Sequence, residues 1–235
     1  MSINQKELQR VIRETLGLDE EQKQLAESYV TQAKVYKLKT DLLSQKAIAA
    51  HQELLQKYVE TLNEISARLD SADRSAANAN NSDYRSLKID EAYNMNAAFL
   101  HAYFFDNIAD TNSKITMDSL AYMRIARDFG TFDEWQKDFI ACAMSARNGW
   151  AMTVYNGFLD RYMNICIDLH SLNVPMNCYP VIVVDMWEHS YFRDYLADKQ
   201  KYTFAMMKEF DWEVIEKRFE RAEKLSKVFS KPLGG

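Results

Sequence analysis

The sequence predicts an α+β fold: a long N-terminal helical hairpin followed by a C-terminal domain with a three-stranded antiparallel sheet flanked by helices. Only 6 of the 235 residues are Gly and 3 are Pro, so turns must be few and helices long. Helical spacing of apolar residues dominates roughly the first half, whereas short β-branched and aromatic runs begin near residue 150. We divide the chain into a helical N-terminal extension (1–43), a helical hairpin domain (44–112) and an α/β domain (113–235).

The sequence pattern of the N-terminal half predicts helices. Residues 4–16 form an amphipathic pattern that stops at Gly17. A capping pattern at Asp19 then opens a stretch without Gly or Pro to about Asp70, which predicts one very long helix or two helices separated near residues 40–44. A solvated connection rich in Ser and Asn (71–84) and a second helix (87–110) follow.

In the C-terminal half the spacing of apolar residues changes from a helical pattern to a strand pattern. A helical stripe that includes Trp135 and Phe139 predicts a helix that ends at Gly149. Three short β-branched and aromatic runs then predict the strands of a small antiparallel sheet, at 150–158, 162–169 and 179–187. The pattern from Tyr195 to Lys227 is helical again.

Composition narrows the classes of function. The formal net charge of −5 argues against a nucleic-acid partner, which needs a basic surface. No apolar run approaches the roughly 18 residues of a membrane span, which argues against a membrane protein. The three cysteines form an odd set without CxxC spacing, and the first residues lack a secretion-type apolar run, so we expect a cytoplasmic protein.

The histidines suggest a metal site. Asp185 and His189 lie four residues apart where the third strand turns into a helix, so both could reach one ion; alternatively, Asp185 caps the helix and His189 is an ordinary buried histidine. His101 lies in an apolar segment that suits a neutral ligand. His51 and Tyr58 are seven residues apart and share one helix face. Three imidazoles and one carboxylate suit iron or manganese and do not exclude zinc.

Several segments resemble one family. The segment DMWEHSYFRDY (185–195) resembles the DxWEHAYYxDY signature of iron/manganese superoxide dismutases. HAYFFDNI (101–108) resembles the second-helix motif HxxFYWNxL, and SQKAIAAH (44–51) resembles the stretch before the first-helix ligand. With FGTFDEWQKDF and RNGW, the resemblance covers about residues 44–220.

The resemblance implies a homodimeric enzyme that converts superoxide to dioxygen and hydrogen peroxide at one Fe or Mn ion per chain. Tyr58 would gate the site, and Glu188 would reach His189 of the second subunit. The family's solvent-contacting Gln is missing, since Ala97 occupies its helix position; His170 is the candidate to replace it, or else a surface residue at a strand end. The remaining implied roles are those of metal ligands, His51, His101, Asp185 and His189, and of pocket walls, Trp150 and Trp187.

The chain also departs from the family pattern. The spacing from His51 to Tyr58 is one residue shorter. Leu54 and Leu55 occupy the stretch of the family's gateway His, and Phe192 replaces its cross-dimer Tyr partner. Losing both members removes a hydrogen-bonded pair without leaving one polar group alone. Two pocket Trp positions also differ, with Phe105 and Met152 in their place.

A second hypothesis is a structural or assembly protein that keeps the dismutase fold and attaches through its N-terminal helices. Residues 1–43 carry 7 basic and 7 acidic residues, so this extension has no net charge. Its apolar stripe must pack on the domain, on a second subunit or on a protein partner, because a short isolated helix is marginal in water.

Overall fold

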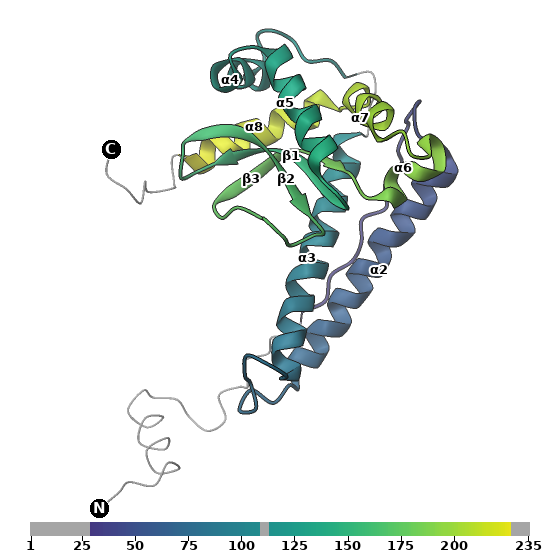
Figure 1. The fold of residues 1–235 in the computed structure, drawn as a ribbon, viewed down its shortest axis with the longest axis vertical. Helices are drawn as coiled ribbons and strands as arrows, with labels where there is room; N and C mark the ends of the chain where they lie inside the picture. Colours follow the sequence, from purple (N-terminus) through teal and green to yellow (C-terminus); the bar gives the residue numbers. More distant parts are fainter. Residues whose placement is uncertain (1–28, 109–112, 227–235) are drawn as a thin grey trace, which may run out of the picture.

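The computed structural model describes residues 29–108 and 113–226, which form a helical hairpin and a sheet domain (Figure 1). The hairpin consists of α2 (Gln45–Asp70) and α3 (Asp83–Asn107), which pack along their lengths. The Ser44 hydroxyl caps α2 by accepting a bond from the Ala47 N–H (3.1 Å). Among the described residues, no helix is both long and apolar enough to cross a membrane.

The α2 helix presents one continuous apolar face to its neighbours. Ile48, Leu55, Leu62 and Leu69 lie seven residues apart and are all at most 5% exposed. Seven residues return a helix to almost the same face, so this spacing keeps the buried stripe in register with α3. The same periodicity places His51 and Tyr58 on one face, as the sequence predicts.

Residues 29–43 correct the prediction of a long helix starting at Asp19, because this segment is not helical and α2 begins only at Gln45. Side-chain amides on α2 hold the backbone of this segment. Asn63 accepts from the Thr31 N–H and donates to the Thr31 carbonyl (2.9 Å each), and Gln52 does the same for Tyr36 (2.8 and 2.9 Å). These bonds give hydrogen-bond partners to a backbone segment that is not part of a helix. The helix predicted at 4–16 lies outside the described residues.

The sheet has the order β2-β1-β3, and both pairs of neighbours are antiparallel. Strand β1 (Gly149–Asn156) lies in the middle and is buried at every residue, whereas β2 (Arg161–Asp168) and β3 (Cys178–Asp185) form the edges. In this register Trp150 of β1 faces Asp185 of β3. The predicted α+β class and the three strands are confirmed.

Helices cover the sheet and end at identifiable residues. The helices α4 (Leu120–Phe129), which the sequence analysis missed, and α5 (Phe132–Ser145) pack near β1 and β2. The predicted continuous C-terminal helix is three helices, α6 (Glu188–Tyr195), α7 (Lys199–Lys208) and α8 (Trp212–Ser226). Leu196, with φ +51°, ends α6, and the Asp198 side chain caps α7.

Gly149 lies where β1 and β2 approach each other closely, at the end of the sheet that carries Trp150. A Cβ atom at Gly149 would lie 1.9 Å from the Ile167 carbonyl oxygen, so the backbone itself must shift. We expect Gly149→Ala to lower the free energy of unfolding by roughly 3 kcal/mol or more, measured by denaturant unfolding. Gly130→Ala is the control, because its space is open and only its φ of +89° is strained, at a cost of about 1–2 kcal/mol. Equal losses in the two variants would show that the strands can separate freely here.

Candidate metal centre

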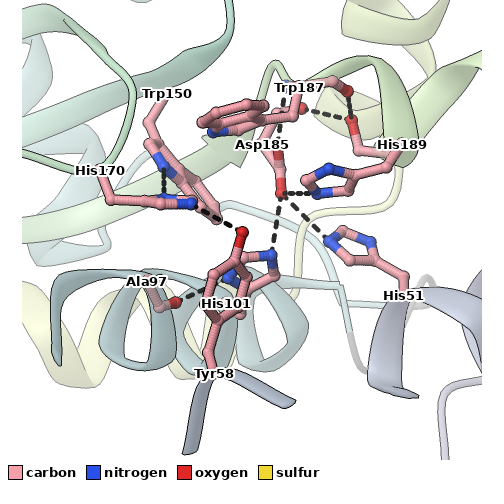
Figure 2. Close-up of polar contacts among 10 residues, drawn as sticks. His51, Tyr58, Ala97, His101, Trp150, His170, Asp185, Trp187 and His189 are labelled. Carbon is pink, nitrogen blue, oxygen red and sulfur yellow. Dashed lines mark hydrogen bonds and ion pairs between the residues drawn. The ribbon is translucent and has the colours of Figure 1, made fainter. Parts of the chain in front are cut away.

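Four side chains from four different elements meet at one point (Figure 2). His51 comes from α2, His101 from α3, Asp185 from the end of β3 and His189 from the start of α6. Their potential ligand atoms all lie within 4.8 Å of one another. The Nε2 atoms of His51, His189 and His101 are 3.1, 3.2 and 3.5 Å from Asp185 Oδ2. Three imidazole edges therefore surround one carboxylate oxygen.

The tautomer of His101 decides what the cluster can bind. Its Nδ1 lies 2.6 Å from the Ala97 carbonyl, and a carbonyl only accepts, so Nδ1 carries the proton. The Nε2 atom of this neutral ring is then an unprotonated lone pair. It is fully buried, has no hydrogen-bond partner, and faces the oxygen of Asp185, which is also an acceptor. Two acceptors that face each other in a buried site fit a cation between them.

Asp185 uses its two oxygens for two tasks. Oδ1 accepts a bond from the Trp187 N–H (2.8 Å) just before α6 begins, and Oδ2 faces the three histidines. The two alternatives for this residue, an N-terminal contact of the helix and a metal-site carboxylate, are therefore compatible. The contact to Trp187 fixes the carboxylate orientation, which is a usual way to orient a metal ligand.

Burial keeps His51 and His101 neutral, which is the state in which an imidazole binds a metal. Burial lowers the pKa of His101 to about 3, with a further contribution from His51, and it also lowers the pKa of His51. Burial alone would raise the pKa of Asp185, but His189 and His51 outweigh it and lower that pKa well below its usual range. The site therefore combines an ionised carboxylate with the neutral imidazoles of His51 and His101. These residues fit a mononuclear Fe or Mn ion.

A hydrogen-bonded chain runs beside the cluster. The Trp150 Nε1–H donates to His170 Nδ1 (3.0 Å), and His170 Nε2 lies 3.0 Å from the Tyr58 hydroxyl. An indole N–H can only donate, so Nδ1 accepts, and neutral His170 has its proton on Nε2, which donates to Tyr58. Burial lowers the pKa of His170 to about 4 and raises the pKa of Tyr58. His170 is fully buried, so it is not the surface residue that one interpretation allowed.

The other predicted pocket residues also lie around the cluster. The Trp187 ring stacks on His170, and the Phe105 ring meets His51 edge-on at 4.9 Å between centroids. On the outer side is a surface cavity of about 470 Å³ next to His51 and His189. Residues that line this cavity include Leu54, Glu188 and Phe192.

Sequence reasoning missed two aromatic neighbours. Phe104 packs its ring 5.4 Å from His51, and Tyr93 packs its ring 4.7 Å from His170. A signal for Tyr93 was present, because it precedes His101 by eight residues and Ala97 by four, which places the three on one helix face. The aromatic residue was overlooked because no charge or metal-binding group marked it.

Comparisons with known proteins agree with this site. A family model described as the C-terminal domain of iron/manganese superoxide dismutases matches residues 118–218. The iron superoxide dismutase of Aquifex aeolicus is 34% identical over 186 residues, which cover 77% of this chain and 86% of that protein. This chain belongs to the iron/manganese superoxide dismutase family.

Relatives in this dismutase family include proteins named for either metal. The iron superoxide dismutase of Methanothermobacter thermautotrophicus is 31% identical over 173 residues, or 72% of this chain and 82% of the relative. A manganese superoxide dismutase of Halobacterium salinarum is 33% identical over 133 residues, or 57% of this chain and 66% of the relative. The family predicted from the sequence motifs is confirmed.

Buried neutral histidines make the stability of the metal-free chain depend on pH. His101 and His170 have folded-state pKa values of about 3 and about 4, below the ordinary value of 6.5, so the unfolded chain binds more protons between pH 6.5 and 4. Stability is thus fully present above pH 6.5 and is lost as the pH falls, by about 1.4 kcal/mol per pH unit for each histidine well below pH 6.5. Denaturant unfolding of the metal-free chain from pH 4.5 to 7 measures this slope.

His170→Gln provides the control for this prediction. Gln does not titrate in this range. The change in unfolding free energy per pH unit should therefore be smaller by the contribution of one histidine. A slope unchanged by His170→Gln would contradict the assignment of a neutral, buried His170.

Proposed function

We propose that the protein is a superoxide dismutase that converts two superoxide ions and two protons to dioxygen and hydrogen peroxide. Family membership supports this reaction, and the cluster supplies a suitable site. The observation that carries the proposal is the buried lone pair of His101 Nε2, which faces the Asp185 carboxylate without a hydrogen-bond partner. A bound Fe or Mn ion would accept an electron from one superoxide and return it to the next.

In this proposal the four clustered residues hold the ion. His101 is oriented by the Ala97 carbonyl, and Asp185 by the Trp187 N–H. His51 and His189 complete the set, with His189 nearest to solvent because its side chain is 28% exposed. Three neutral imidazoles and one carboxylate carry one negative charge, which partly neutralises a divalent or trivalent ion.

Tyr58 and His170 act on protons in the same proposal. The reaction consumes two protons for each pair of superoxide ions, so groups that donate and accept protons must lie beside the cluster. The Tyr58 ring lies 5.2 Å from the His101 ring, and its hydroxyl is bonded to His170. Trp150 fixes which nitrogen of His170 donates and thereby the direction of this hydrogen bond.

Substitution of single ligands tests the proposal. The purified chain should contain about one Fe or Mn ion per chain by elemental mass spectrometry and should dismutate superoxide. His101→Ala should lose both the metal and the activity while the circular dichroism stays helical. His189→Ala should behave in the same way. Because the His189 side chain is partly exposed, its removal disturbs the packing less than the removal of His101. Full activity in a metal-free variant would exclude the proposal.

His170→Gln is the matched control for these variants. His170 is buried beside the cluster but is not one of the four residues that hold the ion. The variant should therefore keep its metal and lose only part of its turnover rate, because Gln can accept from Trp150 and donate to Tyr58.

We further propose that the chain works as a homodimer through the face around Glu188. The Phe192 side chain is 53% exposed there and lines the cavity beside the site together with Leu54. Glu188 is exposed, and its carboxylate makes no hydrogen bond or ion pair with the described part of the chain. An apolar patch with a solvent-exposed carboxylate next to His189 suits contact with a second copy, in which Glu188 would bond the partner's imidazole.

Sedimentation measures this dimer directly. We expect the mass of two chains for the wild type and a weakened dimer for Glu188→Ala, because the second copy loses its hydrogen-bond acceptor. Glu134→Ala is the control, since Glu134 is an exposed carboxylate on α5 that pairs with Lys137 at the surface. A monomeric wild type would contradict the proposal, and so would equal effects of the two substitutions.

We also propose that the protein works in the cytoplasm. The three cysteines are free thiols in the structure, and a reducing compartment would keep them so.

A further inference from the structure

Tyr93 lies directly beside the hydrogen-bonded chain of the proposed site. It sits on α3 two turns before His101 and is partly exposed to solvent. Its ring meets the His170 ring almost edge-on, at 4.7 Å between centroids and an angle of 73°, and it lies 6.5 Å from the Tyr58 ring. None of the four metal-binding residues makes a ring contact with Tyr93 among the described residues. Its contacts are thus with the two proton-handling residues.

The α3 helix holds His170 from two sides. The Asn96 side chain donates to the His170 carbonyl (3.0 Å), and the Tyr93 ring packs against the His170 imidazole. Trp187 stacks on the imidazole as well, at 5.0 Å between centroids. These contacts leave the ring one orientation, in which Nδ1 faces Trp150 and Nε2 faces Tyr58.

The direction of the hydrogen bonds from Trp150 through His170 to Tyr58 determines where the Tyr58 hydroxyl proton points. The Tyr58 oxygen accepts from His170 Nε2–H, so its own O–H must donate elsewhere. Tyr93 is the neighbouring tyrosine, with its ring 6.5 Å from the Tyr58 ring, so its hydroxyl oxygen is placed to accept this proton. In agreement, the interaction with Tyr93 adds to the rise that burial causes in the pKa of Tyr58, and the interaction with Tyr58 opposes the rise that burial causes in the pKa of Tyr93. Both effects are expected when Tyr58 donates and Tyr93 accepts.

We propose that Tyr93 is a positioning residue of the dismutase reaction. Its ring fixes the imidazole of His170, and its hydroxyl oxygen holds the Tyr58 proton away from the metal-binding cluster, on the solvent side. The hydrogen bonds then run in one direction, from Trp150 through His170 and Tyr58 to Tyr93. Tyr93 is partly exposed to solvent, so in this proposal it connects the row of hydrogen bonds with water. This inference rests on the proposed function.

The substitution Tyr93→Phe separates the hydroxyl from the ring. Phe keeps the packing on His170 but removes the acceptor of the Tyr58 proton, so the Tyr58 O–H becomes free to bond an anion at the cluster. We expect azide to bind about threefold to tenfold more tightly, as read from the absorbance of the metal-loaded full chain, because one ordinary hydrogen bond is gained. We expect kcat to fall by a similar factor, because the connection to water is lost.

Opposite changes in azide affinity and turnover distinguish positioning from general damage. Tyr93→Ala also removes the ring, so it should lower kcat further than Tyr93→Phe while the metal content stays at the wild-type level. Tyr84→Phe is the matched control, since Tyr84 is a tyrosine on the same helix that packs on Arg74 far from the site. It should change neither quantity.

Two results would overturn the inference. Azide affinity and kcat of Tyr93→Phe within twofold of the wild type would show that the hydroxyl has no role, and loss of metal in this variant would show a structural role. The azide titration does not require turnover. A metal-loaded wild type without dismutase activity would therefore refute the proposed function, while the azide shift would still decide the role of Tyr93 at the cluster.

Discussion

The site depends on one electrostatic constraint, the convergence of histidine nitrogens on a buried carboxylate. His101 directs a lone pair at Asp185 because the Ala97 carbonyl already holds its only proton. Such an arrangement is unfavourable without a cation and favourable with one. The four residues come from α2, α3, β3 and α6, so an ion at this point would join the hairpin to the sheet domain. Metal binding would then also stabilise the tertiary structure.

The α3 helix organises the surroundings of this cluster. It contributes His101 through one turn, the Ala97 carbonyl through the turn before, and the contacts of Tyr93 and Asn96 with His170. His170 itself comes from the turn that follows β2, which the sheet brings next to Trp150 of β1. The helix therefore sets both the position of His101 in the cluster and the orientation of His170 beside it. A rigid helix with 1.5 Å rise per residue keeps these groups in fixed relation.

The entrance differs in character from the interior. Leu54 and Phe192 line the outer cavity. The resemblance implies a histidine in the stretch of Leu54 and Leu55 and a tyrosine at Phe192. Both changes replace polar groups by apolar ones, so no single partner is left without a hydrogen bond. In the proposed dimer this apolar rim would lie close to the second subunit. Access for a small anion would then depend on shape more than on polar contacts at the rim.

The sequence by itself determined the α+β class, the strands, the family and the four clustered residues. Local spacing accounts for part of this, since His51 and Tyr58 share a helix face and Asp185 and His189 lie four residues apart at the start of a helix. The family and the full set of four residues came from the motifs that resemble the dismutases. Only the tertiary structure decided that residues 29–43 leave the helix, because Gln52 and Asn63 are distant in sequence from the backbone they bind. It also decided that Tyr93 contacts His170, 77 residues later in the chain, because that contact forms only when α3 packs against the sheet.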